Sequence, residues 1–433
     1  MSKIHRQLSD AGAFSAEPEL AFLVDHALEF AFESLQKQLN CPKKTSLRSL
    51  NAMAFLFATA AANIDGRPNA VSAQFVVLTF LSKIACGILG ELEKENSYAN
   101  IYGLVFGWFV SFFSETASTP TLDACFESIY TVLAELEPAA VPQFSFVWFD
   151  IALSPAVLQH PIRSSCEKTQ KHAVRILCMA IEFATKNTLT DHALHLTLIR
   201  VLICILRDHP DFFVKHCTEL TACMPLEALQ IRNIVLSAFP STYTICGPFE
   251  PGLSLETINS SSIHPPIPED VAKHAKTAQE SILAALERLD EVNGPAEHNT
   301  VVNQAVVVAT TTPSKAGKVH DILFSLLRQA QPRQFYRLIS ALINNVRYPN
   351  THTLFCTNIL FEMFLLDFGD LKKEVAMRAI LERLIANRPH PWGVLFLFIE
   401  LVRSEKYSIA DAPFITQKKK VHALFSSIKQ TCL

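Results

Sequence analysis

The stretch 193–207, ALHLTLIRVLICILR, strongly limits the possible folds because it is apolar around most of a helix circumference. At 3.6 residues per turn, its apolar side chains fall on two neighbouring stripes with a narrow polar stripe between them. The first stripe contains Leu194, Leu198, Leu202 and Ile205, and the second contains Leu196, Ile199, Ile203 and Leu206. A helix of this kind is packed on several sides, as in layered α-solenoids.

Glycine usage also favours helices over sheets. The chain has 12 glycines in 433 residues, whereas average usage is about 7%. Sheet-rich and nucleotide-binding folds need glycine at turns, bulges and phosphate loops. The 23 prolines suit helix starts and corners. We therefore predict an all-α fold, a HEAT-like α-solenoid of stacked antiparallel helix hairpins.

Charge and cysteine usage exclude several protein classes. The chain has 38 basic and 41 acidic residues, a net charge of −3, and shows no large electrostatic footprint for nucleic acid. The run Lys418–Lys420 is interpreted as a solvated helix face. Eleven cysteines without C-x-x-C spacing predict free thiols in a reducing compartment. The uncharged stretch 96–114 contains several polar residues and is expected to be a buried helix rather than a membrane span.

The chain is expected to form two helical blocks. The first covers 1–240 and the second covers 269–433, and the proline- and serine-rich residues 241–268 form an irregular crossing segment between them. In the first block we expect helices near 47–63, 70–90, 98–114, 120–136, 168–187, 190–207, 210–220 and 225–239. In the second we expect helices near 269–292, 318–330, 333–347, 351–367, 371–386, 391–403 and 416–430.

Two further predictions concern the stretch 300–311 and the starts of three helices. The β-branched stretch 300–311 suits a strand, although its helical neighbourhood favours a buried helix. Three Ser/Thr-Pro pairs predict capped helix starts, because the hydroxyl satisfies a free backbone N–H and proline is tolerated at the first helical position. These pairs are Thr119-Pro120, Ser154-Pro155 and Thr312-Pro313.

Two corners in the second block carry unusual polar and aromatic residues. The first, 345–353, reads NVRYPNTHT, and Asn350 or Thr351 there can cap the next helix. The second, 382–393, reads ERLIANRPHPWG. Turns inside successive hairpins fall on one edge of a helix stack, so the corners should lie close together. That edge would gather the candidate partner-binding residues Arg347, Tyr348, Asn350, His352, Arg388, His390 and Trp392.

Arginine and aromatic residues are enriched at binding hot spots, which supports this interpretation. The competing interpretation is that each of these residues caps a helix or fills the stack. The two histidines are expected to be hydrogen-bonded corner residues rather than metal ligands, because no cysteine stands beside them.

Known catalytic signatures are absent from the sequence. There is no P-loop, GxGxxG, GxSxG or HExxH pattern, and His192-x-x-His195 lacks a completing glutamate. We therefore expect no catalytic residues, no cofactor and no metal, and predict that the chain is not an enzyme.

The same two corners carry a family resemblance. The blocks INNVRYPNTHTLFCTNILFEMF and ILERLIANRPHPWGVLFLFIELV closely resemble the C-terminal domain of the large scaffold subunit of the CCR–NOT mRNA-deadenylation complex. Upstream, LICILRDHPDFF and QIRNIVLSAFP are similar to the same family. The resemblance is good over about 200–255 and 332–433 and loose over 130–200. Residues 1–130 resemble the family only in helical character, and 256–331 diverge.

The resemblance implies a HEAT-like scaffold that docks a heterodimer of Not-box subunits and joins it to the deadenylase machinery. Other complex subunits would bind the rest of the scaffold. It also implies a role in mRNA decay and in the repression of translation and transcription, in the cytoplasm including P-bodies and also in the nucleus. The family subunit is much longer than this chain. The alternative is an α-solenoid that binds RNA or another adaptor protein. Weak contact with RNA is also compatible with the scaffold role. We expect no role at a membrane.

Overall fold

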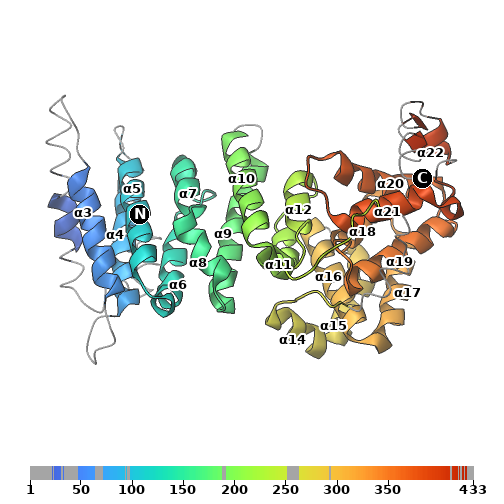
Figure 1. The fold of residues 1–433 in the computed structure, drawn as a ribbon, viewed down its shortest axis with the longest axis horizontal. Coiled ribbons are helices and arrows are strands. Elements are labelled where there is room, and N and C mark those ends of the chain that lie inside the picture. The colour runs from blue at the N-terminus through green and yellow to red at the C-terminus, as the bar shows by residue number, and fades with distance from the viewer. Residues whose placement is uncertain are drawn as a thin grey trace. The chain divides into compact units, whose positions relative to one another are not determined.

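The computed structural model shows a chain built from helices (Figure 1). No strand occurs among the described residues, so the predicted all-α fold is confirmed. Apart from a few isolated positions, the structure describes residues 24–30, 47–63, 72–92, 98–187, 192–250, 263–289, 294–409 and 412–417. The described chain divides into two compact units, Met1–Leu198 and Ile199–Leu433.

The first unit stacks successive helices so that each packs on its neighbour and on the helix after that. Contacts join α3 to α5, α4 to α6, and α4 to α5, which is the pattern of antiparallel helices in layers. Phenylalanine rings fill its core, with Phe80 lying 5.0 Å from Phe57 and 4.6 Å from Phe109 between ring centroids. Its helices are α3 (Arg48–Ala62), α4 (Ala73–Leu92), α5 (Ala99–Thr116), α6 (Thr119–Glu135), α7 (Ser145–Ala152), α8 (Pro155–Arg163) and α9 (Glu167–Lys186).

The second unit is organised around one buried helix, α16 (Pro295–Thr311), which packs against helices that precede and follow it in the chain. Its valines at 302, 306 and 308 are fully buried, so the ambiguous stretch 300–311 is a helix and not a strand. The surrounding helices are α11 (Pro210–Ala222), α12 (Leu229–Leu236), α14 (Glu269–Thr277), α15 (Gln279–Glu287), α17 (Pro313–Gln329), α18 (Pro332–Asn344), α19 (Thr351–Leu365), α20 (Asp370–Ile385), α21 (Trp392–Arg403) and α22 (Pro413–Thr416).

The division between units falls inside α10 (His192–Asp208), earlier than the block boundary expected at 240. The reason is that α11 and α12 pack against α16 and α20 of the later part of the chain. Residues 241–250 and 263–268 contain no helix, as expected for the crossing segment, and 251–262 lie outside the described residues.

Helix α10 is buried on fewer sides than its two stripes predicted. The first stripe, from Leu194 to Ile205, is buried throughout. In the second stripe, Leu196 is 39% exposed and Ile203 is 42% exposed. The apolar pattern therefore identified the helix correctly and overestimated how much of it is covered in this chain.

Several helix boundaries differ from the predictions. Helix α7 was not predicted, and α8 was predicted only through its Ser154-Pro155 start. The expected helix 269–292 is divided between Thr277 and Gln279. Helix α22 lies just ahead of the expected last helix, 416–430, in which the described positions 419, 422, 423, 425 and 426 are helical. Of the three predicted caps, the Ser154 hydroxyl does accept from the Val157 N–H. Thr312 caps nothing, because its hydroxyl accepts from Gln279, and Ser118 rather than Thr119 precedes α6.

The nine cysteines in the described part of the chain are all free thiols, as predicted. Among the described helices, α4 is long and apolar enough to cross a membrane by length and composition alone, and 56% of that window is buried in the fold. The uncharged stretch 96–114, which was expected to be a buried helix, contributes most of α5 and does not meet that test. In the basic run 418–420, only Lys419 is described, and it is exposed.

Candidate functional site

The first corner is held by a closed set of hydrogen bonds around Asn350. Asn350 has extended backbone, and its side-chain oxygen accepts from the N–H groups of His352 and Thr353 at 2.9 and 3.0 Å. Its amide donates to the Tyr348 carbonyl at 2.6 Å. The Thr353 hydroxyl accepts from the Arg347 N–H and donates to the same Tyr348 carbonyl. Asn350 is thus the cap of α19, as the sequence allowed.

All four candidate residues at this corner lie inside the protein. Arg347, Tyr348, Asn350 and His352 are each at most 5% exposed. The Arg347 guanidinium donates to the carbonyl of Val214 on α11 at 3.2 Å and lies 5.5 Å from the centre of the Tyr348 ring. The expectation that these four side chains are displayed for a partner is therefore wrong, and Arg347 joins this corner to α11 instead.

Burial also sets the ionisation of this corner. It lowers the pKa of His352 to about 3, with a smaller effect from the nearby Arg347 and His264 charges. It raises the pKa of Tyr348 to about 12. Both rings are consequently neutral at physiological pH. The Tyr348 hydroxyl and the His352 Nε2 have no hydrogen-bond partner in the described part of the protein.

The second corner, by contrast, reaches the surface. Arg388 is exposed, and His390 and Trp392 are half-buried. Burial lowers the pKa of His390, and the Arg388 charge lowers it further. The Trp392 indole N–H donates to the carbonyl of Cys246 at 2.7 Å, and its ring stacks on Phe396 at 5.4 Å. These three residues remain predicted partner contacts.

The two corners meet, as the hairpin topology predicted. The Gly393 N–H donates to the Arg347 carbonyl. A Cβ atom added at Gly393 would lie 2.8 Å from that oxygen and 2.9 Å from the Val346 carbonyl carbon. Both neighbours are backbone atoms, so only glycine allows α21 to approach the first corner this closely.

The crossing segment contributes surface residues that the sequence analysis did not select. Ser241 is fixed by two hydrogen bonds to the Asp211 carboxylate, and the Trp392–Cys246 bond fixes the next turn. Phe249, three residues further on, is 65% exposed, and Ile385 before the second corner is 77% exposed. The sequence feature that could have pointed to Phe249 is that it is an aromatic residue in a proline-rich segment without helical periodicity. We call residues 246–249 and 385–392 together the corner surface.

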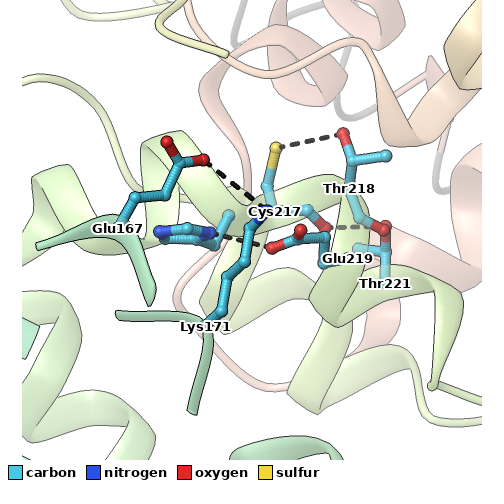
Figure 2. A network of polar contacts seen from close by, with 7 residues as sticks. Glu167, Lys171, Cys217, Thr218, Glu219 and Thr221 are labelled. Carbon is cyan, nitrogen blue, oxygen red and sulfur yellow. Dashed lines mark hydrogen bonds and ion pairs between the residues drawn. The ribbon is translucent and has the colours of Figure 1, made fainter. Parts of the chain in front are cut away.

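Helix α11 satisfies its own polar groups rather than forming a reactive site. The buried His216 Nδ1 lies 2.8 Å from the Glu219 carboxylate. The Thr221 hydroxyl donates to the Cys217 carbonyl at 2.8 Å, and the Cys217 thiol faces the Thr218 hydroxyl at 3.9 Å (Figure 2). These are contacts within one helix, and no base here activates a nucleophile.

In the first unit, a serine and a histidine beside an aspartate, Ser164 and His160, line a cleft of about 760 Å³ between α5, α6 and α8. The His160 Nε2 and the Ser164 hydroxyl both bind the same oxygen of Asp123, at 2.9 and 2.8 Å. A serine nucleophile has to be hydrogen-bonded to the histidine, whereas this hydroxyl donates to the carboxylate. The grouping is therefore not a catalytic triad. No group of three potential metal ligands occurs among the described residues.

Comparison with known proteins identifies relatives. The family model described as "CCR4-Not complex component, Not1" matches residues 112–319 and 297–429. General negative regulator of transcription subunit 1 of Schizosaccharomyces pombe is 27% identical, covering 83% of this chain and 19% of that protein. Its Saccharomyces cerevisiae counterpart is 22% identical, covering 98% of this chain and 23% of that protein. The chain thus spans about a fifth of the length of these relatives.

Solved structures show the same fold at low sequence identity. The NOT1 superfamily homology domain from Chaetomium thermophilum superposes with a TM-score of 0.82 and 20% identity, covering 98% of this chain and 92% of that one. A Not1 C-terminal domain in complex with Not4 gives a TM-score of 0.77 and 20% identity, covering 96% and 94%. Because the family model matches well over half of the sequence, the chain belongs to the Not1 family of CCR4-Not complex components.

Proposed function

We propose that this chain is a protein-docking scaffold domain of a CCR4-Not complex and has no catalytic activity of its own. The observation that carries the proposal is the likeness, over 96% of the chain, to a Not1 C-terminal domain that was solved in complex with Not4. A chain with this fold offers extended helical surfaces to which a partner can bind.

The corner surface supports docking in the second unit. It combines an exposed arginine, Arg388, with the half-buried ring of Trp392 and the exposed apolar side chains of Phe249 and Ile385. Arginine and tryptophan are enriched at the hot spots of protein interfaces. Exposed apolar side chains that lie together are characteristic of a binding surface. We assign the partner contact to this surface rather than to the buried first corner.

The finer proposal follows the resemblance of the corner motifs. The partner is a heterodimer of Not-box subunits, and the scaffold connects it to the other subunits and to the deadenylase machinery. In this role the chain supports mRNA decay and the repression of translation and transcription. We place it in the cytoplasm, including P-bodies, and also in the nucleus.

Co-expression tests the proposal directly. The chain is produced together with the Not-box subunits of its own organism, and the mixture is separated by gel filtration. We expect one stable complex that contains the chain and both subunits. Separate elution of folded components would contradict the proposal. A filter-binding series with RNA is run in parallel, and strong binding that weakens steeply with salt would support the RNA-binding alternative instead.

A further inference from the structure

Two buried arginines face one small cavity in the second unit. The cavity lies between α12, α18 and α20, and Arg232 and Arg383 both line it. Arg232 is 3% exposed and Arg383 is 4% exposed. Arginine is seldom buried to this extent without a paired carboxylate or phosphate.

The hydrogen bonds of these two side chains leave their charge uncompensated. Arg232 Nη2 donates to the carbonyls of Met224 and Pro225, both at 2.8 Å. Arg383 Nη2 has one long bond, 3.4 Å, to the Asn344 side-chain oxygen. Its Nε and Nη1 atoms are buried and have no partner among the described residues. All of the acceptors are therefore neutral amide oxygens.

The carboxylate next in sequence is occupied elsewhere. Glu382 accepts from the Tyr336 hydroxyl at 2.6 Å and from Arg378 Nε at 2.7 Å, on the solvent side of α20. No ion pair joins Arg232 or Arg383 to any Asp or Glu in the described ranges. The interior at this point thus holds two guanidinium groups that no carboxylate contacts, and the charge of Glu227 acts on Arg232 only from a distance.

The energetics of that arrangement are unfavourable for the protein alone. Burial lowers the pKa of Arg232 to about 10, and burial together with the neighbouring Arg232 charge lowers the pKa of Arg383 well below its ordinary value. Arginine nevertheless keeps its proton in proteins. An unpaired buried charge is strongly destabilising, so a bound counter-ion would stabilise this site.

We propose that the cavity between α12, α18 and α20 binds a monatomic anion of the size of chloride, held by Arg383 Nε and Nη1 and neutralising Arg232. The cavity offers about 10 Å³ to the centre of a water-sized sphere, so it has room for one small ion or one water. Phosphate and sulfate are too large for that space. A single water would fit, but it would leave both charges uncompensated.

Bromide identifies the occupant directly, because it replaces chloride and scatters anomalously. Crystals of the full chain are grown with sodium bromide and a map of anomalous differences is calculated. We expect a peak in the cavity, within hydrogen-bond distance of Arg383 Nε or Nη1. Water density without an anomalous peak, or an empty cavity, would overturn the proposal. Peaks at surface positions do not bear on it.

Chloride should also stabilise the protein through mass action. We expect the melting temperature of the full chain to rise by roughly 1.5 °C for each tenfold increase in chloride above the dissociation constant, at constant ionic strength set with gluconate. Arg383→Met should lose this dependence, and the matched control Arg378→Met, an exposed arginine on the same helix, should keep it.

The outcomes separate the proposal from a general salt effect. Equal melting temperatures in chloride and gluconate would contradict it. A chloride dependence that persists in Arg383→Met would place the ion elsewhere and would also contradict it. If Arg383→Met does not fold, the bromide map of the unmodified chain decides. The site is independent of partner docking, so either proposal can fail alone.

Discussion

Among single residues, His352 combines nearly complete burial with a titratable ring. Its Nε2 has no partner in the described structure, and its neighbours include the Arg347 charge. The first corner consequently accepts the imidazole only in its neutral form. Because the buried ring must stay neutral, the stability of the protein depends on pH through His352. The structural role of His352 can therefore be measured.

Replacement of His352 by phenylalanine should flatten the dependence of stability on pH. The pKa of His352 is about 3 in the folded protein and about 6.5 in the unfolded chain. The unfolded state therefore binds the proton first, and the stability that the neutral ring allows is lost as pH falls below 6.5. Between pH 7.5 and pH 5 we expect His352→Phe to lose about 2 kcal/mol less than the unmodified protein. Urea unfolding followed by circular dichroism measures this difference.

The exposed His274 on α14 supplies the control. His274→Phe should leave the pH dependence of unfolding unchanged. If His352→Phe and His274→Phe behave alike, the His352 ring is reached by solvent and the corner is not closed as described. The same result would reopen the first corner as a partner contact.

At the scale of helices, most of the fold followed from apolar periodicity and the corner prolines. The pairing of the two corners also followed from hairpin topology alone. What the sequence could not provide was burial. Arg347 and His352 are residue types typical of a surface, yet both are buried, and Arg347 is bonded to α11, which is far away in the sequence. Periodicity likewise missed α7, an eight-residue helix that is apolar almost all round and shows no stripe.

The approach of α21 to the first corner gives a helix-level prediction. Gly393→Ala should destabilise the protein by about 1–3 kcal/mol, because the new Cβ would meet the backbone of Val346 and Arg347. Gly317→Ala on α17 is the matched control, since a Cβ there meets nothing within 4 Å. It should be neutral or stabilise by up to about 1 kcal/mol, as alanine favours helix. Urea midpoints at constant slope compare the two variants.

Equal stability of the two alanine variants would show that α21 can shift without cost. In that case the corner surface would be adjustable, and Trp392 would not be fixed in place by its packing. A large loss in Gly393→Ala alone would show that the corners form one rigid joint.

For the whole molecule, the functional question is which surface holds the partner. The corner surface and the start of α20 both expose apolar side chains: Ile385 is 77% exposed and Leu371 is 60% exposed. They stand near opposite ends of one helix, about 21 Å apart at 1.5 Å per residue. Hydrophobic exposure alone therefore does not distinguish them. The arginine and tryptophan beside Ile385 favour the corner surface.

Charge substitution at the two ends of α20 decides between them. Ile385→Asp should weaken the complex with the Not-box subunits at least about tenfold, because a carboxylate would be buried against an apolar contact. Phe249→Asp, on the other part of the corner surface, should do the same. Leu371→Asp should bind like the unmodified chain, and all three variants should melt within a few degrees of it, since these side chains are exposed. Titration calorimetry with the purified subunits measures the affinities. Loss of binding in Leu371→Asp but not in Ile385→Asp would move the interface to the α19–α20 end of the unit.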